Sequence, residues 1–238
     1  HLPLKLLSII VGRAGYLSGM HFLNKQIKPK RYTDDEILNL CKVIIDSGRS
    51  YSKIKKSIFP LAYPFHASEY LGALHGLSSI LLMILNSPWF QRTPLVKELT
   101  NAPTDILNDV KGTIDLLLSL QDEEGNFPTA ADDAQENIRQ PPLIQWCHGS
   151  PGIIYLLIKA YKVFKEEKYL NAARKVADVI WRCGLLTAGP SLCHGVAGNG
   201  YAFLMMFRAT GEVQYVYRAF KFAEFLKHPH FTVWRRND

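Results

Sequence analysis

The residues best suited to chemistry are two Cys-His-Gly motifs, at Cys147-His148-Gly149 and at Cys193-His194-Gly195. Each motif opens a Gly-x-x-Gly that runs into an apolar segment, "GSPGIIYLLI" in one case and "GVAGNGYAFL" in the other. Two unrelated buried cysteines would act as small apolar side chains. Because both cysteines hold the same place in the pattern, and zinc prefers thiolate and imidazole ligands, the motifs predict a Zn²⁺ site.

The number of ligands decides what such a site does. Two cysteines and one histidine leave the fourth tetrahedral position open for a substrate, whereas two cysteines and two histidines close the site and make it structural. The residues alone leave open whether His148, His194 or both bind the metal.

The two motifs belong to a repeat along the chain. Segments of the same pattern begin at Gly12, Gly76, Gly149 and Gly195. Their spacing of 64, 73 and 46 residues is uneven, so loops of different length must connect similar elements. His75 holds the position before Gly76 that a histidine also holds in both Cys-His-Gly motifs. We interpret His75 as a general acid or base, with a hydrogen-bonded core histidine as the alternative.

Two kinds of helix alternate along the chain. The segments after the repeated glycines are apolar on nearly all sides, which is typical of buried helices. Between them lie amphipathic segments, one of which starts at Thr33, a residue type that favours an N-cap. Two others have apolar stripes at helical spacing. These stripes are Tyr169, Ala173, Val176, Ile180 and Cys183, and then Val213, Val216, Phe220, Ala223 and Leu226.

This alternation predicts an all-α fold, in which an inner ring of buried helices is surrounded by an outer ring of amphipathic ones. Such an α/α toroid brings the residues before each Gly-x-x-Gly to one end of the ring. A linear helical solenoid is the alternative, but its repeats are usually more regular in length. We expect residues 1–238 to form a single, partial domain of this kind, in which the ring is incomplete.

The motifs "HGLSSI", "QWCHGSPGIIYLLIKAYKVFKEEKYL", "ADVIWRCGLL" and "LCHGVAGNGYAFL" resemble the eukaryotic LanC-like proteins, relatives of the bacterial lanthionine cyclases. The similarity runs from about residue 10 to about residue 227. The resemblance implies a toroid of seven inner and seven outer helices. It also implies zinc ligands at Cys147, Cys193 and His194, an active-site histidine at His75, and a role for His148 in lining the site.

The resemblance further implies a reaction. A zinc-activated thiol, from glutathione or from a peptide cysteine, adds to dehydroalanine or dehydrobutyrine in a peptide or protein, which makes the protein a C–S bond-forming transferase. Arg139, shortly before "WCHG", is the candidate to contact an anionic substrate. The cysteine content favours reduced thiols in a cytoplasmic setting, and the resemblance adds peripheral contact at the plasma membrane as an expectation.

The sequence departs from the family pattern in ways that motivate an alternative function. We find four of the seven expected units, and we expect the earlier units before residue 1 and the last unit after the final segment. The family's "GDAG"-like motif, which carries an active-site Asp, has no match in this sequence. The family also has a basic residue just before the second zinc motif, and this sequence has Ala188 and Gly189 there. A non-catalytic adaptor that binds zinc and glutathione is therefore the second hypothesis.

Composition excludes several other classes. The net charge of +7 arises partly from clusters at residues 25–31 and 53–57, which we interpret as solvated surface, with weak contact to anionic lipid as the alternative. No nucleic-acid-binding motif accompanies them. Four cysteines in 238 residues do not make a disulfide scaffold. A glycosidase-like barrel lacks the paired carboxylates that it would need at the heads of the repeats.

Overall fold

The computed structural model describes residues 7–66, 68–91, 100–135 and 143–227. These residues form helices, with two isolated bridges and no longer strand among them. The helices are α1 (Arg13–Gln26), α2 (Asp34–Lys55), α3 (Leu77–Leu85), the 3₁₀ turn η1 (Pro88–Phe90), α4 (Thr104–Ser119), α5 (Ala131–Gln135), α6 (Ser150–Phe164), α7 (Glu167–Cys183), α8 (Val196–Thr210) and α9 (Val213–Phe225). None of these helices is long and apolar enough to span a membrane.

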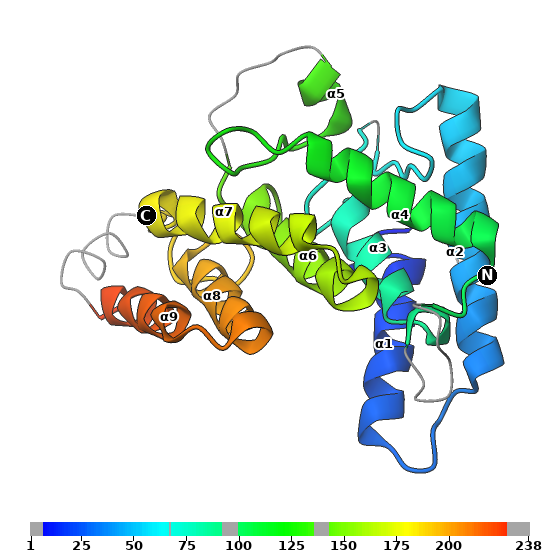
Figure 1. The fold of residues 1–238 in the computed structure, drawn as a ribbon, viewed down its shortest axis with the longest axis horizontal. Coiled ribbons are helices and arrows are strands. Elements are labelled where there is room, and N and C mark those ends of the chain that lie inside the picture. Colours follow the sequence, from blue (N-terminus) through cyan, green and yellow to red (C-terminus); the bar gives the residue numbers. More distant parts are fainter. Residues whose placement is uncertain (1–6, 67, 92–99, 136–142, 228–238) are drawn as a thin grey trace.

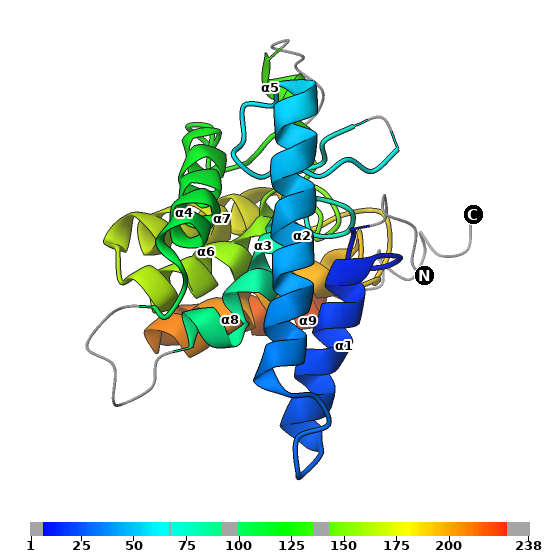
Figure 2. The same cartoon turned by 90° about the vertical axis from the view of Figure 1, so that its right-hand side faces the viewer.

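Inner and outer helices alternate, as the sequence predicts. The inner helices α1, α3, α6 and α8 contact one another in succession, and α2, α7 and α9 pack as outer partners on α1, α6 and α8. Figure 1 shows these pairs following one another across the molecule, from α1 and α2 on one side to α8 and α9 on the other. Figure 2 shows α1 lying beside the first half of the longer helix α2.

The repeated glycines set the starts of the inner helices. Gly12, Gly76, Gly149 and Gly195 are the N-caps of α1, α3, α6 and α8, which confirms the repeat read from the sequence. Three of the four have extended backbones, whereas Gly149 has φ +90°, a conformation that disfavours side chains. The loops that precede α3, α6 and α8 can therefore meet at one end of the inner layer.

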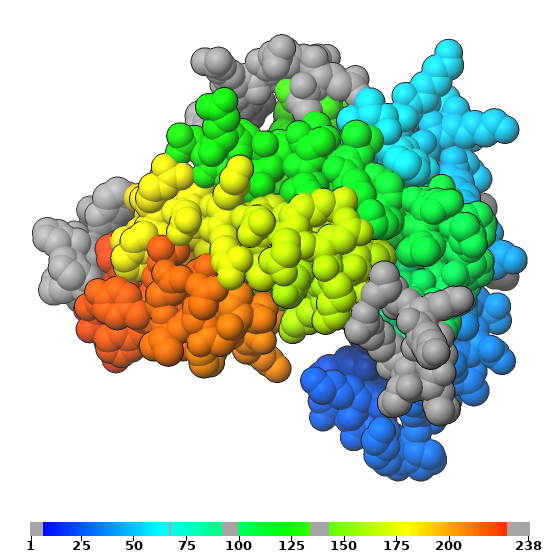
Figure 3. All heavy atoms as spheres, in the orientation of Figure 1, coloured from blue at the N-terminus to red at the C-terminus, as the bar shows by residue number. Residues whose placement is uncertain are grey.

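Polar contacts join the outer helices. Arg49 of α2 binds Asp105 and Asp109 of α4, and Tyr169 of α7 donates a hydrogen bond of 2.6 Å to Asp115 of α4. Through these contacts α4 links α2 to α7. In Figure 3 the green atoms of α4 and the yellow atoms of α7 form one continuous surface. Because the groups lie at the surface, each ion pair adds little stability by itself, and the buried side chains of the inner helices hold the fold.

For the amphipathic helices, the structure confirms the predicted N-cap of α2 and contradicts the predicted buried face of α9. Thr33 caps α2, and a reciprocal bond from Glu36 completes a capping box. In α9 the predicted stripe is wrong, because Val213 and Phe220 are 73% and 58% exposed. The buried face of α9 is instead made of Tyr215, Ala219 and Phe222. This helix has two apolar faces, and packing against its neighbours selects the aromatic one.

Candidate functional site

Backbone hydrogen bonds connect the three loops that begin the inner helices. The amide of Cys147 donates to the carbonyl of Cys193 at 3.1 Å, and the amide of Leu74 donates to the carbonyl of Cys147 at 3.4 Å. The loops before α3, α6 and α8 therefore lie against one another. The structure brings together the residues that the sequence predicted to converge.

Two glycines permit this close contact. A Cβ at Gly72 would lie 2.3 Å from the carbonyl oxygen of Cys147, and a Cβ at Gly149 would lie 1.8 Å from the carbonyl oxygen of Leu143. Distances below 3 Å are not possible for a side-chain carbon, so both positions require glycine. Gly72 brings the loop of His75 against the loop of Cys147, and Gly149 folds that second loop back on itself.

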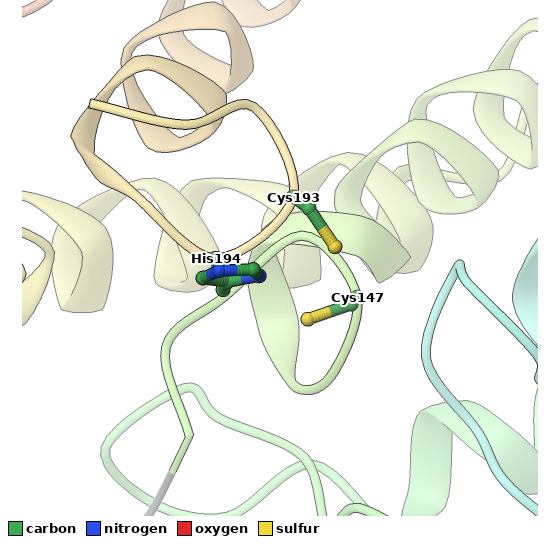
Figure 4. Close-up of side chains that lie close together, drawn as sticks. All are labelled: Cys147, Cys193 and His194. Carbon is green, nitrogen blue, oxygen red and sulfur yellow. The ribbon is translucent and has the colours of Figure 1, made fainter. Parts of the chain in front are cut away.

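Cys147, Cys193 and His194 form a cluster of potential metal ligands. One ligand atom from each residue lies within 4.8 Å of the other two. Figure 4 shows Cys147 on the loop before α6, and Cys193 with His194 on the loop before α8. Cys147 is buried, Cys193 is half-buried and His194 is exposed. The cluster is thus open to solvent on the side of the imidazole.

The donor set fits zinc. Around a tetrahedral zinc ion, thiolate and imidazole ligand atoms lie about 3.6–3.8 Å apart, and the three ligand atoms here already lie within 4.8 Å of one another. Two sulfurs and one nitrogen are the soft and borderline donors that zinc selects over magnesium or calcium. With three protein ligands the fourth position would remain for a substrate.

The surroundings of Cys147 favour its protonated thiol over the thiolate. Burial, together with the neighbouring Cys193, raises the pKa of the Cys147 thiol to about 12. Its Sγ donates a hydrogen bond of 3.4 Å to Oε1 of Gln145, as a protonated thiol does. A thiolate at this place needs a positive charge beside it, and a divalent metal ion supplies one.

His75 lies on the loop that leads into α3, beside this cluster. Its imidazole is half-buried, and burial, with a smaller contribution from His66, lowers its pKa. Its Nδ1 is buried and has no hydrogen-bond partner among the residues that the structure describes. The ring therefore favours the neutral state, in which imidazole can accept a proton.

His148 lies near His75 and does not join the three clustered donors. Burial, followed by the proximity of His75, lowers its pKa. Its ring lies 5.2 Å from the ring of Tyr70, and its Nδ1 is buried without a partner in the described part of the chain. The role of His148 in lining the site stays a prediction.

Some contributors to the site were missed from the sequence, and one predicted residue cannot be placed. Arg139 lies outside the described residues. The ring of Phe65 stacks on His75, and Tyr70 faces His148, although neither residue belongs to the repeated motifs. His66 is exposed and lies close enough to His75 to lower its pKa further. No signal in a single sequence marks these neighbours.

An apolar groove of about 660 Å³ begins at Cys193. Its lining comes from the segments before α1, α3, α6 and α8 and from α6 and α8 themselves, and includes Trp146, Leu192, Tyr155, Tyr201, Leu204 and Arg208. Among the described residues that line it, Arg208 is the one charged side chain. The volume is in the range of ligand pockets in general.

Comparisons with known proteins agree with this architecture. The family described as lanthionine synthetase C-like protein matches residues 5–235. A Danio rerio relative named glutathione S-transferase LANCL1 is 35% identical over 218 residues, which are 91% of this chain and 50% of the relative. The chain thus spans about half the length of that relative.

A solved structure shares the fold. Nisin cyclase superimposes with a TM-score of 0.62 at 18% identity, over 95% of this chain and 56% of nisin cyclase. At this identity the likeness shows the fold alone, the α/α toroid of inner and outer helices. The family match over nearly the whole chain and the identity to the Danio rerio relative show that this chain belongs to the lanthionine synthetase C-like family.

Proposed function

We propose that this protein adds a thiol, from glutathione or a peptide cysteine, to a dehydroalanine or dehydrobutyrine residue of a peptide or protein. The observation that carries the proposal is the cluster of Cys147, Cys193 and His194, with ligand atoms within 4.8 Å, on loops bonded to the loop of His75. Zn²⁺ is the metal that we assign to this cluster. When bound, it would lower the pKa of a coordinated thiol and so favour the nucleophilic thiolate.

The addition balances without a leaving group. The thiol sulfur bonds to the β-carbon of the dehydroamino acid, the π bond of the double bond breaks, and one proton ends on the α-carbon. We assign the proton transfer to His75, because its lowered pKa keeps the imidazole neutral and able to accept the proton of the thiol. The resulting imidazolium can then donate that proton to the α-carbon.

The groove beside Cys193 supports a peptide as the acceptor. Its walls are aromatic and aliphatic, which suits the side chains that flank a dehydroamino acid better than the polar skeleton of glutathione. Arg208 offers a positive charge to a carboxylate of the bound segment. The names of the two relatives, a glutathione S-transferase and a nisin cyclase, fit a thiol donor and an acceptor of this kind.

Metal analysis and a transfer assay test this proposal. We expect close to one zinc per chain, and formation of a thioether adduct when glutathione and a dehydroalanine peptide are supplied. His75→Gln should abolish adduct formation and leave the zinc content unchanged. The matched control is His21→Gln on α1, because glutamine can keep the hydrogen bond that His21 makes to the carbonyl of Met83.

The outcomes separate the candidate functions. A folded protein that purifies without metal and takes none up would contradict the zinc site. A zinc-loaded protein that binds glutathione and forms no adduct would favour the adaptor function. Adduct formation that survives His75→Gln would contradict the role given to that residue.

A further inference from the structure

Phe65 is fixed at a tight turn that precedes α3. Its amide donates a hydrogen bond of 3.0 Å to the carbonyl of Ser68, and the amide of Ser68 donates one of 3.3 Å to the carbonyl of Phe65. His66, next along the turn, has a left-handed backbone with φ +54°. These constraints determine where the Phe65 side chain leaves the backbone.

The Phe65 ring lies flat against the imidazole of His75. The ring centroids are 3.7 Å apart and the planes differ by 8°. The ring of His66 also contacts this phenyl ring, in a T-shaped arrangement with the ring centroids 4.5 Å apart and the planes at 79°. Phe65 therefore contacts two imidazoles and covers one face of the ring to which we assign proton transfer.

No hydrogen bond to Nδ1 of His75 orients its imidazole among the described residues. A histidine that moves protons is usually oriented by a bond from one ring nitrogen to a carboxylate or a backbone carbonyl. In His75 the Nδ1 is buried and lacks such a partner among the described residues. The aromatic stack is the ring contact that the structure shows for this imidazole.

We propose that Phe65 is a positioning residue, which sets the orientation of the His75 imidazole by stacking, where other sites use a hydrogen bond. The proposal rests on the proposed function for its catalytic consequence, whereas the orientation itself can be measured without turnover. A planar partner at 3.7 Å resists tilting of the imidazole, and a small misplacement of a proton-transferring group costs up to about 100-fold in rate.

Substitutions that separate ring shape from apolar bulk test the proposal. Phe65→Leu keeps an apolar side chain and removes the planar face, whereas Phe65→Tyr keeps the ring. We expect Phe65→Leu to lower kcat for adduct formation by about 10- to 100-fold, with unchanged zinc content and unchanged KM for glutathione. Phe65→Tyr should stay within about threefold of the wild type, since the stack is retained.

A control and a folding check accompany these variants. Phe220→Leu changes an exposed phenylalanine on α9, 58% exposed, and should leave kcat unchanged. Thermal unfolding of all variants shows whether Phe65→Leu is folded, and Phe65→Met provides a second non-aromatic variant. An unchanged kcat in both non-aromatic variants would overturn the positioning role.

Nuclear magnetic resonance supplies a readout independent of activity. Carbon-bound ring protons of His75 lie over the phenyl face, so ring current should shift their resonances upfield in the wild type and in Phe65→Tyr. In Phe65→Leu these resonances should return to ordinary positions, with His75→Gln giving the assignment. If the wild type shows no upfield shift, the positioning role is wrong. If the shift is present and no variant turns over substrate, the proposed function is wrong and the orientation by Phe65 still holds.

Discussion

The amide of Cys147 donates a hydrogen bond of 3.1 Å to the carbonyl oxygen of Cys193. This bond joins the two Cys-His-Gly loops at the residues whose sulfurs take part in the candidate metal cluster. The backbone itself thus holds the two cysteine loops side by side. A preorganised pair of this kind should bind zinc more tightly than two cysteines on independent loops.

Removal of one thiol should therefore remove the metal. We expect Cys193→Ala to lower the zinc content from about one per chain to near zero, because two remaining ligands do not hold zinc in competition with a chelator. Cys183→Ala is the matched control, since Cys183 is a free, exposed cysteine outside the cluster. Equal zinc in both variants, measured by elemental analysis, would show that the cluster is not the metal site.

Gly149 should tolerate substitution much less than Gly189. Both glycines have a positive φ, +90° and +96°, and both precede an inner helix. An added Cβ at Gly189 meets nothing within 4 Å, whereas at Gly149 it would meet the carbonyl of Leu143 at 1.8 Å. We expect Gly189→Ala to lower the free energy of unfolding by about 1–2 kcal/mol, which is the cost of the backbone conformation alone. Gly149→Ala should cost about 3–5 kcal/mol and also weaken zinc binding.

Urea unfolding of the two alanine variants, together with zinc titration, measures this difference. Similar losses of stability at the two positions would mean that the loop before α6 relaxes around a side chain. The close approach of Leu143 would then not be a constraint on the metal loop.

The sequence predicts the elements of the site better than their surroundings. The glycine N-caps and the Thr33 cap depend on neighbouring residues, so local sequence is sufficient to find them. The repeat position also identifies His75. In contrast, the stack of Phe65 on His75 comes from a turn ten residues earlier, and nothing in the repeat marks it.

The error at α9 has a similar origin. Its helix offers one apolar stripe through Val213 and Phe220 and another through Tyr215 and Phe222, and periodicity alone does not rank them. The structure buries the second stripe, where Phe222 meets Phe203 at 5.1 Å between ring centroids. Tertiary packing thus decides which face is the core.

Acid should destabilise the fold partly through His21. Burial lowers the pKa of this histidine, whose Nε2 lies 3.1 Å from the carbonyl oxygen of Met83. In the unfolded chain the pKa is about 6.5, so below that pH the unfolded state binds more protons than the folded state. The stability from neutral His21 is present above about pH 6.5 and is lost as the pH falls through the folded-state pKa.

We therefore expect the free energy of unfolding to fall between pH 7.5 and pH 5.5, and to fall less in His21→Gln. Chemical denaturation at the two pH values measures both changes. The control is His66→Gln, which removes an exposed histidine. If His21→Gln shows the full loss of the wild type, then other buried groups account for the acid sensitivity.

A substitution in the groove beside Cys193 should weaken binding of the peptide substrate and leave binding of the thiol substrate unchanged. Tyr201 on α8 lines the groove and is 55% exposed, whereas Tyr217 on α9 is 56% exposed and lies outside it. We expect Tyr201→Ala to raise the KM for a dehydroalanine peptide several-fold and to leave the KM for glutathione unchanged. Tyr217→Ala should change neither. A raised KM for glutathione in Tyr201→Ala would instead assign the groove to the thiol substrate.

The separation of the two cysteine loops has a consequence for the newly made chain. Cys193 follows Cys147 by 46 residues, so at roughly 5–20 residues per second it leaves the ribosome about 2–9 s later. During that interval the first motif has a thiol and no partner loop. The metal site can form only after α7 and the second motif have emerged. A metal ion that needs both cysteines, as we propose for zinc, can be captured only after the second motif has been made.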